Sequence, residues 1–149
     1  MIGPGTVGRV TDDLPECHFA FPGPLRDRLV AAVLDGSKTT TTGLLQDREI
    51  EGEPLPRVGD RSVVVDSTGR PVAVIELTEV RVMRLGDVDV VHARDEGEGY
   101  ATVAEWRAGH EEFWHGADYR GWLKDATFTV DDDTRVVAQR FAVRERLRA

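Results

Sequence analysis

The sequence predicts an α+β fold in which a mostly antiparallel, barrel-like β-sheet is flanked by helices. Two runs rich in β-branched residues, 61–66 and 72–83, are separated by Ser67-Thr68-Gly69-Arg70, which is a strong hairpin signal. Residues 72–83 are apolar on both faces of the predicted strand, and this pattern indicates burial from both sides, as in a closed or nearly closed barrel. The order of the predicted elements, helix, strands, helices and strands, is typical of the α+β class.

Length, charge and cysteine content restrict the location and the ligands to be expected of the protein. The 149 residues are expected to form one domain, residues 21–149, after an irregular Gly- and Pro-rich arm at residues 1–20. The apolar runs are too short to span a bilayer, and the single Cys17 excludes an internal disulfide, so we expect a cytoplasmic protein without a membrane partner. The net charge of −8 argues against binding of extended duplex nucleic acid and leaves a nucleoside or a short single strand as ligand.

The first helix is predicted over residues 24–35. A proline occupies its first turn, apolar residues recur every four positions, and Gly36 is typical of the residue that ends a helix. Residues 43–60 are then expected to form a loop, with a short strand near Leu44-Leu45.

Two further helices are predicted in the second half of the chain. Asp87 can cap a short helix over residues 88–96, which places His92 and Glu96 on one face. Thr102-Val103-Ala104-Glu105 has the pattern of a capping box and opens a helix that extends to about residue 115. The last third is expected to contain a loop at 116–125, a strand at 127–130 and a final strand at 136–145.

The stretch from Asp35 to Thr42 is the strongest candidate for chemistry. It holds Lys38, one of only two lysines in the chain, among five hydroxyl side chains. Burial and neighbouring groups can turn a lysine into a general base, and Thr41 could be its nucleophile; the alternative is a polar loop after a helix. In a regular strand Lys38 and Thr41 would point to opposite faces. If the two residues act together in catalysis, this stretch must instead be an irregular loop with both groups in one cleft, and this is what we predict.

Acidic side chains cluster around Glu96, at the end of the second predicted helix. Such a cluster attracts a nearby ammonium, although by itself it is usually a solvated helix end. We expect Glu98 to lie on another side of the helix end from Glu96. No metal or other cofactor is predicted, because His110 and His115 are five residues apart and do not present two ligands on one helical face.

Several short sequence blocks occur in a recognisable order. A G-x-K-x-x-T pattern runs from Gly36 to Thr41, and the later blocks are Val58-Gly59-Asp60, Gly69-Arg70-Pro71, Ile75 to Val80, His92 to Glu98 and Trp106 to His110. The first block resembles the signature of the ASCH domain family, and the later blocks resemble the segments that follow it in the larger bacterial members. Together they cover nearly the whole chain, from about Phe19 to Val143.

This resemblance implies a fold related to the PUA domain, with a cleft suited to RNA or to modified nucleosides. Family members are described as RNA-binding modules, as ribonucleases and as amidohydrolases that act on N4-acetylcytidine. In the amidohydrolase a lysine, a threonine and a glutamate carry out the reaction, and the motifs transfer these roles to Lys38, Thr41 and Glu96. The resemblance therefore implies that Glu96 reaches the loop that holds Lys38. Ser37, Thr39 and His92 are then the residues expected to contact substrate.

The resemblance therefore predicts a hydrolase that acts on an acylated nucleoside or a similar small amide. The alternatives are an RNA-binding module and a ribonuclease acting on single-stranded RNA. One departure concerns the substrate: the small amidohydrolase has an arginine two residues after its threonine, where this chain has Gly43. A group that could contact acetylcytidine is therefore missing.

Overall fold

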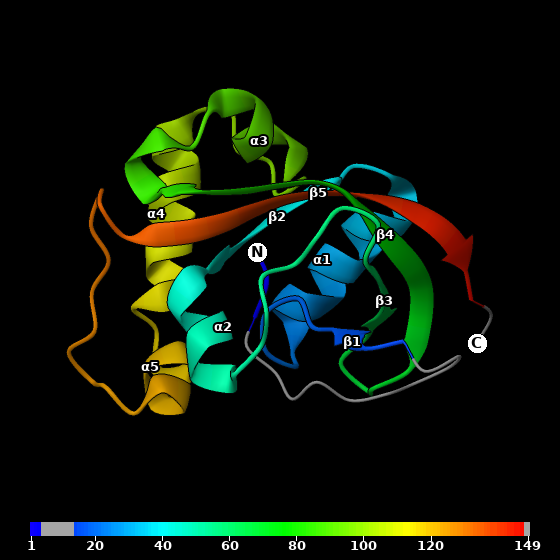
Figure 1. Cartoon of the computed structure of the whole chain (residues 1–149), viewed down its shortest axis with the longest axis horizontal. Coiled ribbons are helices and arrows are strands. Elements are labelled where there is room, and N and C mark those ends of the chain that lie inside the picture. Colours follow the sequence, from blue (N-terminus) through cyan, green and yellow to red (C-terminus); the bar gives the residue numbers. More distant parts are fainter. Residues whose placement is uncertain (4–13, 148–149) are drawn as a thin grey trace.

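The protein forms one five-stranded sheet packed against helices (Figure 1). The structure is a computed structural model that describes residues 1–3 and 14–147. The strands are β1 (Glu16–Cys17), β2 (Thr40–Leu44), β3 (Arg61–Val65), β4 (Pro71–Arg84) and β5 (Arg135–Arg146). The helices are α1 (Pro24–Asp35), α2 (Leu45–Glu51), α3 (Val90–Asp95), α4 (Val103–Trp114) and α5 (Ala117–Leu123), with a 3₁₀ turn at Leu85–Asp87. None of the helices in these described ranges has the length and hydropathy of a bilayer-spanning segment.

The sheet is mixed and open, with strand order β1-β3-β4-β5-β2. The long β4 and β5 pair antiparallel from Ala73↔Arg146 to Arg84↔Arg135, and two register shifts in β4 bend the pair. The short β1 pairs with β3 in parallel, whereas β2 pairs with β5 in antiparallel orientation. Within the described residues β1 and β2 are edge strands that do not pair with each other, so the prediction of a closed barrel was wrong.

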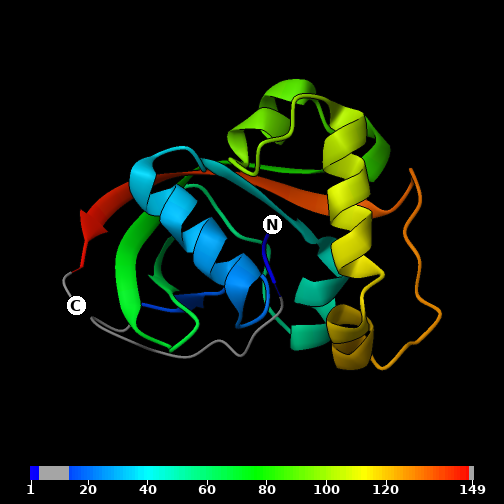
Figure 2. The same ribbon diagram turned by 180° about the vertical axis from the view of Figure 1, so that it is seen from behind.

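The two apolar faces of β4 have a different physical origin from barrel closure. The first half of the strand packs on α1, through Ile75 and Leu77 beside Leu29 and Val33. The second half packs, through Met83, in a separate core formed mainly by α4 and α5. Figure 2 shows α1 across one half of the sheet and α4 with α5 across the other. A long bent strand that serves two cores is apolar on both faces without belonging to a barrel.

Local sequence signals predicted some helices correctly. Helix α1 has the predicted bounds, and Gly36 ends it in the left-handed conformation with φ 88°. Helix α4 begins after Thr102, whose side chain accepts a hydrogen bond from the Glu105 N–H. Helix α3 is shorter than predicted, because Asp89 rather than Asp87 is its cap.

Two short helices occupy stretches that were predicted to be loops. Helix α2 lies within residues 43–60, and α5 lies within residues 116–125. They contact each other, since the Tyr119 hydroxyl donates a hydrogen bond to Asp47 and accepts one from Gln46. Such short helices depend on tertiary packing, which no local signal reports. The strand predicted at 127–130 is absent; this described stretch is irregular and accepts hydrogen bonds from Arg120 at the Phe128 carbonyl.

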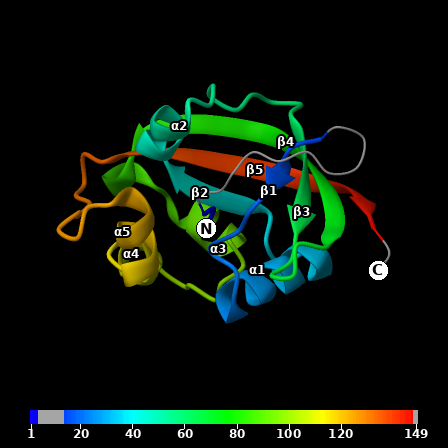
Figure 3. The ribbon, with the colours of Figure 1, turned by 90° about the horizontal axis from the view of Figure 1, so that it is seen from below.

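Residues 1–3 lie inside the molecule, in the gap between the two edge strands. The Ile2 N–H donates to the Thr42 carbonyl of β2 at 3.1 Å, and the Gly3 N–H donates to the carbonyl of His18, directly after β1, at 2.9 Å. Met1 is only 2% exposed. Figure 3 shows this end of the chain among β1, β2 and α3. The predicted irregular arm thus begins with a buried Met1 and two half-buried residues, while its residues 4–13 lie outside the described part.

We predict that Gly97 fixes how α3 sits on the loop before β2. Gly97 has φ 73°, and a Cβ there would lie 2.7 Å from the backbone of Ser37. Gly99 has a similar φ of 89° but open space around it, which makes it the matched control. Urea unfolding should show that Gly99→Ala costs about 1–2 kcal/mol of stability through backbone strain, and Gly97→Ala about 3–4 kcal/mol through strain and overpacking. Equal costs would show that the close packing at Gly97 contributes nothing.

Candidate active site

Lys38 is buried at the free edge of β2. The left-handed Gly36 turns the chain out of α1, and residues 37–39 are irregular before the strand begins at Thr40. The Lys38 amine donates to the Thr40 carbonyl at 2.8 Å, to the Glu96 carbonyl at 3.3 Å and to Glu96 Oε1 at 3.2 Å. It also lies 5.3 Å from the centre of the Phe19 ring. Three acceptors match the three hydrogen-bond donors of a lysine side chain.

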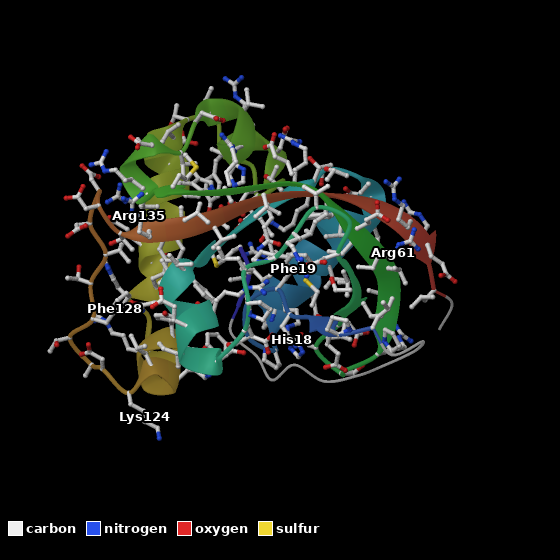
Figure 4. The ribbon with its side chains drawn as sticks, in the orientation of Figure 1. His18, Phe19, Arg61, Lys124, Phe128 and Arg135 are labelled. Atoms are coloured by element: carbon white, nitrogen blue, oxygen red, sulfur yellow. The ribbon has the colours of Figure 1, made fainter. Side chains whose placement is uncertain are left out.

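The other lysine has a different environment. Lys124 follows α5 and projects into solvent at the far end of the molecule, whereas Phe19, which lies against Lys38, is inside (Figure 4). Of the two lysines, only Lys38 is positioned for chemistry in an enclosed site.

Glu96 is fully buried, and its carboxylate is the centre of the site. Oε1 faces two cations, the Lys38 amine at 3.2 Å and the Met1 α-amine at 2.5 Å. The Met1 α-amine also lies 3.6 Å from Glu98 Oε2. Glu98 therefore lies beside the same cation as Glu96, and not on another side of the helix end as expected.

The second oxygen of Glu96 is held by neutral donors and a histidine. Oε2 accepts hydrogen bonds from the Thr42 hydroxyl at 2.7 Å and from the Trp106 indole at 2.8 Å. His110, stacked on Trp106, places Nε2 3.2 Å from the same oxygen. With Lys38, these groups replace the water that an exposed carboxylate would have.

The pKa values in the cluster follow from burial and from the paired charges. Burial by itself raises the pKa of Glu96, but Met1, His110 and Lys38 outweigh it and hold the pKa well below its usual range. Burial lowers the pKa of the Met1 amine, against the opposing effect of Glu96. Glu96 is thus a carboxylate near neutral pH, in a site that has lost most of its contact with water.

His92 is a neutral link in this network. Burial lowers its pKa to about 4. The Thr42 hydroxyl has a single proton, which goes to the Glu96 carboxylate, so His92 Nε2, 2.7 Å from the Thr42 oxygen, must be the protonated ring nitrogen. A directed chain of hydrogen bonds therefore runs from His92 through Thr42 to Glu96.

Thr41 faces the other way from Thr40 and Thr42. Successive side chains of β2 alternate, so Thr40 and Thr42 contact α3 while Thr41 lines a cleft of about 490 Å³. The prediction of an irregular loop with Lys38 and Thr41 in one cleft was therefore wrong, because Thr41 lies in the regular strand β2 and Lys38 is not among the residues that line this cleft. The Thr41 hydroxyl is buried and makes no hydrogen bond with any described residue. Gln139, its pairing partner on β5, and Cys17 line the same cleft. Burial raises the pKa of the Cys17 thiol to about 11, so that thiol stays in its unreactive protonated form.

The three residues expected to contact substrate, Ser37, Thr39 and His92, do not lie together in the cleft. His92 lies in the Glu96 network, on the side of β2 opposite the cleft. Ser37 is exposed and donates a long hydrogen bond back to the Ala32 carbonyl. Thr39 is bound to Arg140 at the surface side of the loop. The structure therefore brings Lys38 and Glu96 together but leaves Ser37 and Thr39 outside the cleft.

Thr42, Trp106 and His110 were missed as members of the site. Both Trp106 and His110 lie on the buried face of α4, and the spacing of one helical turn places both side chains toward Glu96. A buried tryptophan needs an acceptor for its indole N–H, and this requirement was the available signal.

Glu96, Glu98 and His110 also present ligand atoms within 4.8 Å of one another. A carboxylate–histidine group of this kind suits a divalent cation. However, the Met1 and Lys38 amines already face Glu96, and their positive charge opposes a further cation. The donor set therefore fits an ammonium better than a metal ion.

Gly43 adjoins the N-terminal segment. A Cβ at Gly43 would lie 2.5 Å from the Ile2 side chain, so the absence of a side chain here makes room for Ile2. The position where the small amidohydrolase has an arginine is thus covered by the protein's own chain.

The protein thus has an α+β fold with an open sheet. Its candidate site is a buried lysine–glutamate pair at the free edge of one strand. The chain belongs to the ASCH domain family, whose family model matches residues 17–145. No curated protein matches the sequence.

Two solved structures are similar over most of the chain. Protein EF3133 from Enterococcus faecalis V583, described under the family model DUF984, is 26% identical, with a TM-score of 0.74 and coverage of 87% of this chain and 75% of that one. An ASCH domain from Lactobacillus crispatus JV V101 is also 26% identical, with a TM-score of 0.73 and coverage of 86% and 77%.

We predict that replacement of Glu96 by glutamine unfolds the site. The variant leaves two buried cations without a counter-charge, which should cost about 3–5 kcal/mol of stability in urea unfolding. Glu98→Gln is the control. It removes only the 3.6 Å contact with Met1 and also removes the cost of burying an otherwise unpaired carboxylate oxygen, so it should cost about 1 kcal/mol or less. Similar losses in both variants would contradict the central role of Glu96.

We also predict that His92 makes stability depend on pH. Its pKa is about 4 in the folded protein and about 6.5 when unfolded, so between these values the unfolded chain binds more protons and stability falls as pH falls. His92→Gln does not titrate there. The stability difference between the protein and this variant should shrink by about 3 kcal/mol from pH 7 to pH 4, measured by urea unfolding. A difference that is independent of pH would show that His92 is not held neutral.

Proposed function

We propose that this protein hydrolyses an amide bond in a small acylated, nucleoside-like substrate, with Thr41 as nucleophile, Lys38 as proton acceptor and Glu96 as the residue that positions Lys38. The observation that carries the proposal is the Thr41 hydroxyl, which is buried, without a hydrogen-bond partner among the described residues, and in the wall of a cleft. Buried hydroxyl groups are normally hydrogen-bonded, so an unpaired one at a cavity suggests a role with ligand.

The position of Lys38 supports this assignment. Its amine bonds to the carbonyl of Thr40, the residue before Thr41, and therefore lies at the strand edge, between the two faces of β2. No hydrogen bond joins Lys38 to Thr41 in this arrangement. The reaction therefore requires the amine form of Lys38 and its movement from the Thr40 carbonyl toward the Thr41 hydroxyl when substrate is bound.

The proposed reaction has two steps. The Thr41 oxygen bonds to the amide carbon while its proton passes to the Lys38 amine; Lys38 then gives that proton to the leaving nitrogen as the C–N bond breaks, and an acyl ester on Thr41 remains. Water, deprotonated by the Lys38 amine, next attacks the ester. The carboxylic acid leaves, and the proton on Lys38 returns to the Thr41 oxygen.

Glu96 holds Lys38 through both its side chain and its backbone carbonyl, at 3.2 and 3.3 Å. The hydrogen bonds from Thr42 and Trp106 fix the carboxylate in turn. This arrangement suits a positioning role, in which Glu96 limits the directions open to the amine and stabilises the ammonium form after proton transfer.

The cleft favours a small molecule over a polyanion. Its volume of about 490 Å³ falls within the usual range for small-ligand sites, roughly 300–1,000 Å³. Its lining mixes acidic residues such as Glu16, Asp47 and Asp60 with Arg48 and Arg61, rather than presenting a basic surface. Together with the net charge of −8, this composition supports the nucleoside-like substrate over RNA binding or ribonuclease activity.

The test is turnover of N4-acetylcytidine and a panel of other N-acylated nucleosides by the folded protein. We expect hydrolysis of at least one member of the panel, loss of at least about a thousandfold in kcat/KM for Thr41→Val, and retained turnover in Thr41→Ser. The valine variant has the same shape without the nucleophile, and the serine variant restores the hydroxyl. No turnover across the panel, or equal activity of Thr41→Val, would contradict the proposal; cleavage of short single-stranded RNA in chelator would favour a ribonuclease.

A further inference from the structure

The N-terminal tripeptide is bound in the gap between β1 and β2 in the way that a peptide ligand would be. Its α-amine, its two following backbone N–H groups and the side chain of Ile2 each meet a separate feature of the protein. The geometry of each contact shows what the gap recognises.

The amine end is held by acidic side chains. The Met1 nitrogen lies 2.5 Å from Glu96 Oε1 and 3.6 Å from Glu98 Oε2. The Glu98 side chain is only 8% exposed, and its Oε2 has no hydrogen-bond partner among the described residues. A buried carboxylate oxygen aimed at a cation and otherwise unpaired is suited to an ammonium group, because only a cation offsets the cost of burying it.

The backbone of the tripeptide bridges the two edge strands. The Ile2 N–H reaches the free carbonyl of Thr42, and the Gly3 N–H reaches the carbonyl of His18. The Thr42 carbonyl lies on the free edge of β2 and the His18 carbonyl lies directly after β1, so main-chain hydrogen bonds recognise any extended chain in the gap.

The shape of the gap restricts which side chains fit at the second and third residues of the bound peptide. The missing Cβ of Gly43 makes room for the Ile2 side chain, which packs on the core beside α1. A Cβ at Gly3 would lie 2.4 Å from the carbonyl oxygen of Ala20, so the third residue must be glycine. The gap thus selects a free amine, an apolar second residue and a glycine.

We propose that the gap between β1 and β2 is a binding site for the free amino end of an extended peptide with glycine as its third residue, and that the protein's own Met1–Gly3 fills this site. The inference goes beyond the proposed hydrolysis and does not need it, although the two share Glu96. An N-terminal segment bound here also competes with any other ligand that reaches Glu96.

The experiment compares the chain that begins at Met1 with one that has Gly-Ser added before Met1, which turns the α-amine into an amide. The probes are Met-Ile-Gly-amide, its N-acetylated form and Met-Ile-Ala-amide, titrated by calorimetry. We expect the original chain to bind none of them, because its site is filled by a tethered segment. The extended chain should bind the free-amine glycine peptide at least about tenfold more tightly than either of the other two.

Binding of the acetylated peptide as tightly as the free amine, or no binding by the folded extended chain, would overturn the inference. Glu98→Gln in the extended chain should weaken binding of the free-amine peptide and leave weak binding of the acetylated peptide unchanged. Since no probe contains the acyl-nucleoside amide, a negative hydrolysis assay leaves this result unaffected, and the two proposals can fail separately.

A second variant decides the question if the extended chain does not fold. Gly43→Ala in the original chain would place a Cβ against Ile2 and should expel the segment, so the amides of Ile2 and Gly3 should exchange with solvent at least about tenfold faster. Gly121→Ala, in α5 with open space around it, is the control and should leave this exchange unchanged. Unchanged protection of Ile2 and Gly3 in Gly43→Ala would contradict a specific fit at the gap.

Discussion

The buried carboxylate of Glu96 is the interaction on which the rest of the site depends. It joins α3 to the loop before β2 through Lys38, to β2 through Thr42 and to α4 through Trp106. Removing a carboxylate from water is costly. The structure offsets that cost with the Met1 and Lys38 amines on one oxygen and with Thr42, Trp106 and His110 on the other. The relative placement of three elements is therefore set by the hydrogen-bonding geometry of a single side chain.

This arrangement explains why Lys38 and Thr41, the two reactive candidates, do not lie on the same face of β2. The Glu96 network uses the side chains of Thr40 and Thr42, so the strand's alternation turns Thr41 toward the cleft. Lys38 lies between the two faces because its acceptors include a backbone carbonyl at the strand edge. The hydroxyls that hold the Glu96 network, on Thr40 and Thr42, are thus on the residues directly before and after Thr41, whose hydroxyl is unpaired.

The sequence predicted the parts of the fold that have local signals. Gly36 ends α1, and the turn after residue 66 forms the β3–β4 hairpin, because both depend on backbone conformation within a few residues. Helix α5 and the open sheet were missed, since each depends on packing between distant segments. The pairing of Glu96 with Lys38 was reached only through the family resemblance, because a cluster of acids at a helix end usually remains solvated.

The free edge of β2 has a consequence for association between molecules. An unpaired strand edge is a template for pairing with another chain, and proteins commonly block such edges with a lysine or an irregular segment. Here the carbonyl of Thr40 accepts a hydrogen bond from Lys38, and the carbonyl of Thr42 accepts one from Ile2, so both of these acceptors are already used. The groups that close the site thereby also block this edge. A ligand that displaced Met1–Gly3 would have to cover the same edge or leave it open to intermolecular β-pairing.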